Sequence, residues 1–118
     1  MIKLVIVDDD RLTSSLLQTL FELEGFDVIC VAESNRVIPV VEREEPSAVL
    51  LDFHVGSTES TTLIRQMRGN PRLAGMSIVV FSGEDRSKET LAAGANRFVL
   101  KPFAPDSLVQ IVREMASD

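Results

Sequence analysis

The stretch Ser47-Ala48-Val49-Leu50-Leu51-Asp52 is an apolar run that ends in a carboxylate. The run Ile2-Lys3-Leu4-Val5-Ile6-Val7 also ends in acid, at Asp8-Asp9-Asp10. A third run, Asn96-Arg97-Phe98-Val99-Leu100, leads into Lys101-Pro102-Phe103. Carboxylates that are crowded together without a partner cost free energy. The pattern therefore predicts a cation site beside a reactive group, at the carboxyl ends of buried strands.

Patterns typical of strands and helices alternate along the whole chain. Strands are expected at residues 2–7, 26–31, 48–51, 77–81 and 97–100. Helical spacing between and after them is carried by the following residues: Leu12, Leu16, Leu20 and Leu23; Val37, Val40 and Val41; Leu63, Ile64 and Met67; residues 86–93; and Leu108, Ile111, Val112 and Met115 after Pro105. Nearly continuous apolar strands indicate burial on both faces, as in a parallel sheet covered by helices. Five βα units of an α/β fold follow.

The connections of such a sheet decide where its polar residues gather. Right-handed crossovers leave the carboxyl ends of all strands at one edge, and ligands of open α/β sheets bind there. Five polar residues fall at or just after predicted strand ends and are expected in one pocket: Asp8, Asp9, Asp52, Ser82 and Lys101.

Composition limits the class of protein. The 118 residues are 45% hydrophobic and 25% charged, values that fit one globular domain over residues 1–118. The net charge is −6 and no basic block is present, which disfavours direct binding of nucleic acid. The apolar stretches have the length of strands, so neither a membrane span nor a signal peptide is expected. The lone Cys30 is expected to be a small buried strand residue in a reducing compartment, which favours the cytoplasm.

The chemistry of the pocket follows from its donor atoms. A site that offers only oxygen ligands favours Mg²⁺, or Mn²⁺, over zinc. Lys101 would add a positive charge and Ser82 a hydroxyl donor, while the Asp52 carboxylate can attack phosphorus and form an acyl phosphate. Each residue also has a plainer interpretation: Asp9 or Asp10 could cap the next helix, and Lys101 and Ser82 could be surface and loop residues.

Taken together, these motifs resemble those of a response regulator receiver domain, the phosphoacceptor of two-component signalling, such as the chemotaxis regulators. The resemblance covers essentially the whole chain and implies a flavodoxin-like (βα)5 sandwich whose five-stranded parallel sheet has the order 2-1-3-4-5. It is carried by five segments: Ile6-Val7-Asp8-Asp9-Asp10, Val49-Leu50-Leu51-Asp52, Val79-Val80-Phe81-Ser82-Gly83, Ala93-Gly94-Ala95 and Lys101-Pro102-Phe103.

The resemblance also implies roles for single residues. Asp52 would be phosphorylated by a sensor histidine kinase or a histidine phosphotransfer protein. Asp9 and Asp52 would ligate Mg²⁺ together with the backbone carbonyl of His54, and Asp8 would act largely through water. Lys101, followed by a peptide bond to Pro102 that is usually cis, would pair with the phosphoryl group. Ser82 would be the switch hydroxyl, and Phe98 either the switch aromatic or a core residue.

The segment after Asp52 departs from the family pattern. Receivers commonly carry a methionine-proline pair and then aspartate-glycine, whereas this chain reads Phe53-His54-Val55-Gly56-Ser57-Thr58-Glu59-Ser60. The missing proline and the small residues predict a more mobile loop over the site, and Gly83 replaces the usual alanine. His54 is either an exposed loop residue or, with Glu84 across the pocket, a group that tunes dephosphorylation.

The expected function is a phosphoacceptor switch rather than a turnover enzyme. Phosphorylation of Asp52 would shift the face formed by the fourth helix, the fifth strand and the last helix, and so control a downstream effector or a fused output domain. The domain would be a monomer or a phosphorylation-dependent dimer. The alternatives are a receiver-like binding module that takes no phosphate and a small hydrolase with an aspartyl-phosphate intermediate. A flavin-binding module is disfavoured, because three aspartates would repel its phosphate.

Overall fold

A five-stranded parallel sheet runs through the middle of the molecule in the computed structural model, which describes residues 1–116. Residues 117 and 118, which the expected domain includes, lie outside that description. The strands are β1 (Lys3–Val7), β2 (Asp27–Val31), β3 (Ala48–Asp52), β6 (Ser77–Ser82) and β7 (Arg97–Leu100). Their order is β2-β1-β3-β6-β7, which confirms the predicted 2-1-3-4-5 arrangement of a flavodoxin-like fold.

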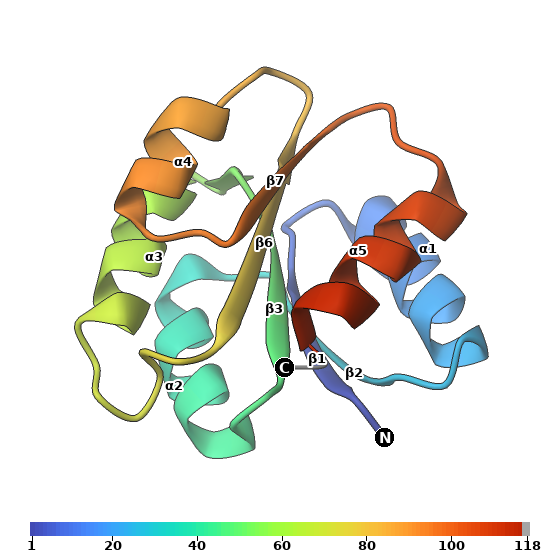
Figure 1. Ribbon diagram of the computed structural model, residues 1–118, viewed down its shortest axis with the longest axis horizontal. Helices are drawn as coiled ribbons and strands as arrows, with labels where there is room; N and C mark the ends of the chain where they lie inside the picture. Colours follow the sequence, from blue (N-terminus) through green and yellow to red (C-terminus); the bar gives the residue numbers. More distant parts are fainter. Residues whose placement is uncertain (117–118) are drawn as a thin grey trace.

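Helices cover both faces of this sheet (Figure 1). One face carries α1 (Arg11–Leu23) and α5 (Pro105–Ala116). The other carries α2 (Ser34–Glu44), α3 (Ser60–Arg68) and α4 (Ser87–Ala93). The five strands begin and end within one residue of their predicted boundaries.

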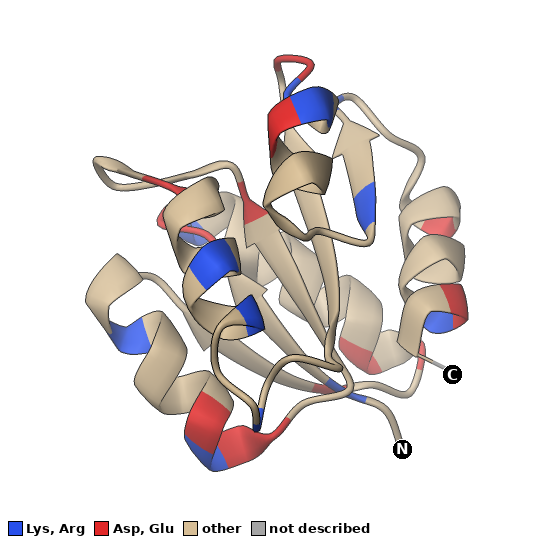
Figure 2. Cartoon of the chain, turned by 60° about the vertical axis from the view of Figure 1, so that its left-hand side comes forward, with Lys and Arg blue, Asp and Glu red and all other residues tan. Residues whose placement is uncertain are grey.

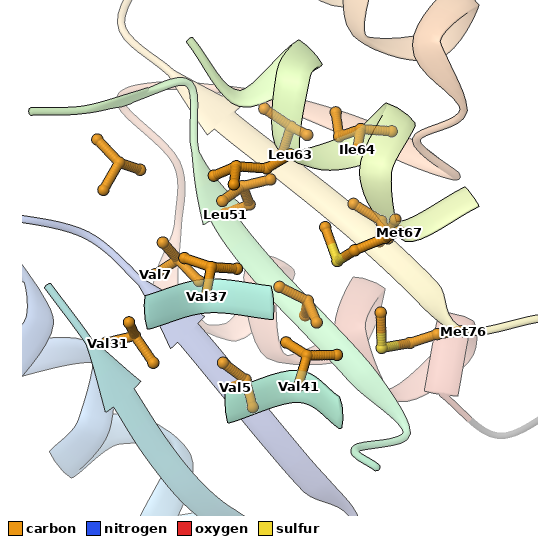
Figure 3. Packing of buried hydrophobic residues seen from close by; sticks show 14 of the residues in the cluster. Val5, Val7, Val31, Val37, Val41, Leu51, Leu63, Ile64, Met67 and Met76 are labelled. Carbon is orange, nitrogen blue, oxygen red and sulfur yellow. The ribbon is translucent and has the colours of Figure 1, made fainter. Parts of the chain in front are cut away.

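Successive side chains of each strand point to opposite faces of the sheet, so a separate apolar cluster forms on each face. Val5, Val7 and Leu51 point to the side of α2 and α3, where they pack with Val37 and Ile64 (Figure 3). The intervening residues, among them Leu4, Ile6 and Leu50, pack on the other side with residues of α1 and α5. These strand residues are fully buried, which explains why the strands read as continuous apolar runs.

Only part of the predicted row of leucines in α1 faces the core. Leu17 and Phe21 are the buried residues of this helix, whereas Leu12, Leu16 and Leu23 are 69%, 63% and 80% exposed. Leu20, the remaining member of the predicted row, is partly buried and packs against the apolar cluster, so the row lies only partly on the covered side of the helix. Among the described residues, no helix has the length and apolar character that a membrane crossing requires.

Two local expectations are wrong. The segment after Asp52 is a short hairpin of β4 (His54–Val55) and β5 (Thr58–Glu59) instead of a loop without regular structure. Gly56 is the first central residue of its two-residue turn and has a φ of +61°, a position at which type II′ turns place glycine. Cys30 is exposed instead of buried, because β2 lies at the edge of the sheet.

Candidate functional site

The reversal of strand order lies between β1 and β3, and it places the site. From β1 the chain first builds β2 on one side and then β3 on the other. The helices leaving β1 and β3 turn to opposite faces, so a crevice opens between the carboxyl ends of these two strands. Val7 pairs with Leu51, which sets Asp8 and Asp9 beside Asp52. Figure 2 shows acidic segments in the loops along this edge of the sheet.

Asp8, Asp9 and Asp52 form a cluster of carboxylates. Each offers an oxygen atom, and the three oxygens lie within 4.8 Å of one another. Asp8 is 1% exposed, Asp52 is half-buried and Asp9 is exposed. The structure thus brings together three of the residues that the sequence predicts as metal ligands.

Asp10, the third aspartate after β1, has a different role. Asp10 is the N-cap of α1, where its Oδ1 accepts a hydrogen bond from the amide of Leu12 at 3.1 Å. Its Oδ2 accepts a second bond from the Thr13 hydroxyl at 3.0 Å. These bonds hold the pKa of the Asp10 carboxyl below its ordinary value. The capping interpretation is therefore correct for Asp10, while Asp8 and Asp9 belong to the pocket.

The surroundings of Asp8 disfavour the charged form of its carboxyl group. Burial, with a further contribution from the nearby Asp52 charge, raises its pKa to about 6. A hydrogen bond from the Asp10 amide to Oδ1, at 2.9 Å, and the charge of Lys101 act in the opposite direction. Among the described residues, its buried Oδ2 atom has no hydrogen-bond partner.

These observations fit a hard divalent cation. Buried carboxylate oxygens normally have a partner, and an orphaned one calls for an ion or water in its place. Three carboxylates and no histidine or cysteine in the cluster provide the oxygen ligands that Mg²⁺ or Mn²⁺ prefers. A cation would also offset the two causes that raise the pKa of Asp8, which are its burial and, to a lesser extent, the charge of Asp52.

Lys101 and Ser82 lie at the same edge. Ser82 pairs with Leu100 across β6 and β7, and the Lys101 amide donates to the Ser82 carbonyl at 2.8 Å. The Lys101 ammonium lies 4.7 Å from the centre of the Phe81 ring, and the peptide bond to Pro102 is cis, as expected. The buried Ser82 hydroxyl accepts a bond from the Glu84 amide at 3.2 Å.

His54, Glu84 and Phe98 each make contacts outside the acidic cluster. The ring of the exposed His54 lies nearly perpendicular to the Phe53 ring, with 4.7 Å between ring centres. Glu84 forms an ion pair with Arg86 at 3.5 Å. Phe98 is half-buried against the apolar cluster on the side of α2 and α3.

Sequence reasoning missed Arg86. Its guanidinium group lies 4.8 Å from the centre of the Phe53 ring and also pairs with Glu89. This stacking ties the segment after Asp52 to the segment after Ser82. Residues 53 and 86 are 33 positions apart, so no periodicity in the sequence signals the contact.

The raised pKa of Asp8 predicts a pH-dependent stability for the metal-free protein. A carboxyl that binds its proton more tightly when folded destabilises the fold once the unfolded chain has lost that proton. From about pH 7.5 to about pH 5 this group should therefore add about 1 kcal/mol of stability. Urea unfolding in a chelator, at both pH values, measures the change.

Asp8→Asn is the control for this effect, since it removes the titrating group and keeps the shape. The difference in unfolding free energy between wild type and variant should shrink as the pH falls. A difference that does not vary with pH would show that Asp8 is not held in a strained charged state.

The fold and the pocket together define the class of protein. It is a doubly wound, flavodoxin-like α/β domain with an acidic pocket at the point where the strand order reverses. Within that class, the chain belongs to the response regulator receiver domain family, whose model matches residues 4–113. It is therefore a receiver domain of the two-component signalling type, a family of switches rather than of turnover enzymes.

Solved structures of receiver domains share the fold of this chain. The BeF3-activated N-terminal receiver domain of Klebsiella pneumoniae RstA is 28% identical, with a TM-score of 0.89 over 98% of this chain and 99% of that one. A CheY-like receiver domain protein from Methanospirillum hungatei is 24% identical, with a TM-score of 0.90 over 98% and 94%. The receiver domain of the Pseudomonas aeruginosa sensor histidine kinase PA1611 shares the fold at 20% identity and a TM-score of 0.89, over 99% and 98%, and has a magnesium ion in its active-site cleft.

Proposed function

We propose that residues 1–118 form one receiver domain in which Asp52 accepts a phosphoryl group from a phosphohistidine. The observation that carries this proposal is the cluster of Asp8, Asp9 and Asp52, with Lys101 and Ser82 at the same edge of the sheet. Asp52 is the half-buried member of the cluster that ends β3, so it is accessible to a donor and held by a rigid strand.

The proposed step is a displacement at phosphorus. An oxygen of Asp52 attacks the phosphoryl group and forms an acyl phosphate, while the bond from phosphorus to the donor's imidazole nitrogen breaks and its electron pair returns to the ring. Asp8, Asp9, Asp52 and the backbone carbonyl of His54 would hold Mg²⁺, which neutralises charge on the phosphoryl oxygens. Lys101 supplies a second positive charge, and the Ser82 hydroxyl donates to a phosphoryl oxygen.

The proposed output is a change on the face formed by α4, β7 and α5. Ser82 gives up its bond from the Glu84 amide when it turns toward the phosphoryl group, which shifts the segment that leads into α4. Phe98 is half-buried on β7 and can follow this movement. Leu91 of α4 and Leu100 of β7 are 46% and 49% exposed, so two elements of this face offer apolar side chains to a partner.

The proposed partners follow from the chemistry. The donor is a sensor histidine kinase or a histidine phosphotransfer protein, and the target is a downstream effector or a fused output domain. We place this exchange in the cytoplasm, with the domain acting as a monomer or as a phosphorylation-dependent dimer. The net charge of −6 gives the domain no attraction for nucleic acid.

The test is incubation of the protein with acetyl phosphate in the presence of Mg²⁺, followed by intact-mass measurement. We expect the mass of one phosphoryl group to appear, and to be absent when a chelator removes the metal. Beryllium fluoride should shift amide NMR signals of α4, β7 and α5. A protein that stays unmodified with every phosphodonor in Mg²⁺ would contradict the proposal, and sustained turnover of an organic phosphate would favour a hydrolase instead.

His54 should control the lifetime of the acyl phosphate. Its ring packs against Phe53, next to Asp52, where it can shield the phosphoryl group from water. We expect His54→Ala to shorten the half-life about threefold, a change in the activation barrier below about 1 kcal/mol. Loss of the adduct over time, followed by mass, measures this. A longer half-life would mean that the ring positions the attacking water, and an unchanged half-life would remove His54 from hydrolysis altogether.

A further inference from the structure

The hairpin after Asp52 is bonded directly to the acidic cluster. The amide of Gly56 donates a hydrogen bond to Oδ2 of Asp9, with 3.0 Å between nitrogen and oxygen. These two residues are 47 positions apart, so the bond joins the hairpin turn to the loop between β1 and α1. The bond exists because residue 56 has an amide hydrogen, which a proline at this position would lack.

The same hairpin has a second attachment. The Thr58 hydroxyl donates to the Ser34 hydroxyl oxygen at 3.0 Å, which ties β5 to the first residue of α2. The turn is therefore held on one side by Asp9 and on the other by α2. A turn with two such attachments has a defined position relative to the cluster.

Asp9 needs a restraint of this kind. It is the exposed member of a cluster whose charges repel one another, and an exposed side chain is free to swing into solvent. The repulsion acts at short range, because the three carboxylate oxygens lie within 4.8 Å of one another. A hydrogen bond from a backbone amide to a carboxylate is charge-assisted and so among the stronger ones available to an exposed group.

We propose that the Gly56 amide is a positioning group for the metal site: it holds Asp9 in the orientation that binds the divalent cation. The inference rests on the proposed function, in which Asp9 is a metal ligand. Its consequence is that the hairpin and the cation are coupled. Any contact that moves the hairpin changes the affinity for Mg²⁺, and the bound cation stabilises the hairpin in return.

Isothermal titration with Mg²⁺ tests this in the absence of any phosphodonor. We expect Gly56→Pro to weaken Mg²⁺ binding about fivefold, which corresponds to about 1 kcal/mol. Gly56→Ala keeps the amide hydrogen and reports the cost of a side chain at a φ of +61°, whereas the proline ring also fixes φ near about −65°; the alanine variant should therefore bind clearly better than the proline variant. Thr58→Val removes the other attachment of the hairpin but keeps the bond from the Gly56 amide to Asp9, so it should lose clearly less Mg²⁺ affinity than the proline variant does.

Hydrogen exchange with water, followed by NMR on the metal-free protein, gives a second readout that does not depend on the proline variant folding. In Asp9→Ala the Gly56 amide should exchange about fivefold faster than in wild type, because its acceptor is gone. Unchanged exchange would overturn the inference, as would equal loss of Mg²⁺ affinity in the proline, alanine and valine variants. A wild-type protein that binds no Mg²⁺ would contradict the proposed function itself. Equal Mg²⁺ affinities of the wild type and Gly56→Pro would contradict only the positioning role of the Gly56 amide.

Discussion

Asp52→Asn is expected to abolish the covalent phosphoryl adduct completely. The amide that replaces the carboxylate has no nucleophilic oxygen of comparable strength, and the acyl phosphate cannot form at that position. The variant should remain folded, because asparagine is nearly the same size and Asp52 is half-buried at the end of β3. It should also be at least as stable as wild type, since one of three crowded negative charges is removed. Intact mass after treatment with acetyl phosphate and Mg²⁺ measures the adduct, and urea unfolding measures the stability.

Asp27→Asn provides a matched control. Asp27 begins β2 at the opposite end of the sheet, is exposed, and pairs with Lys3 in the strand register. Its variant should take up the phosphoryl group as wild type does. An adduct that persists in Asp52→Asn and maps to Asp8 or Asp9 would show that another carboxylate of the cluster is the acceptor, and the proposed role of Asp52 would be wrong.

The strands and the pocket were predictable because one physical signal controls both. A strand buried on both faces must be apolar throughout, so the first polar residue after it marks where the chain leaves the core. In β1 and β3 that residue is Asp8 or Asp52. Parallel topology then brings the marked ends together without any signal from sequence proximity. The gathering of these polar residues at one edge of the sheet is thus a consequence of the fold class.

The different roles of Asp8, Asp9 and Asp10 could not be predicted from the sequence. Three identical side chains in a row differ only in which one reaches an amide of α1, which faces the buried crevice and which stays in solvent. That choice depends on backbone geometry at a single turn, where Asp10 has the extended conformation of an N-cap. The sequence therefore allowed capping by Asp9 or Asp10, and the structure assigns it to Asp10.

Contacts between distant exposed segments were also beyond sequence reasoning. The hairpin at Gly56 was expected to be mobile because small residues favour flexibility. Its bonds to Asp9 and Ser34 depend on tertiary position instead. The exposed leucines of α1 also show that the spacing of apolar residues does not identify the buried side of a helix. A helical row of apolar residues indicates that one face is apolar, but Leu17 and Phe21, outside that row, are the buried residues of this helix.

Arg68 holds together the loops at the amino ends of β6 and β7. Among substitutions outside the pocket, its replacement should lower the free energy of unfolding most. The Arg68 guanidinium donates to the carbonyls of Gly94, Ala74 and Met76 at 2.8, 2.8 and 2.6 Å, and to the side chain of Asn96 at 2.8 Å. It thereby joins the end of α3 to the two loops that lead into β6 and β7. Gly94 is adapted to it, because a Cβ there would lie 2.7 Å from Cγ of Arg68.

Arg68→Ala should lower the free energy of unfolding by about 2 to 3 kcal/mol, since partly buried carbonyls lose charged donors that nothing else replaces. Arg65→Ala is the matched control: it removes an exposed arginine one turn earlier in α3 and should change stability by no more than about 0.5 kcal/mol. Urea unfolding of both variants measures the difference. Equal stabilities would mean that water satisfies the carbonyls once Arg68 is gone, and that the α3–β6–β7 edge is held by apolar packing alone. If the predicted loss is found, phosphorylation of Asp52 in the folded fraction should still proceed, because Arg68 lies at the end of the sheet away from the pocket.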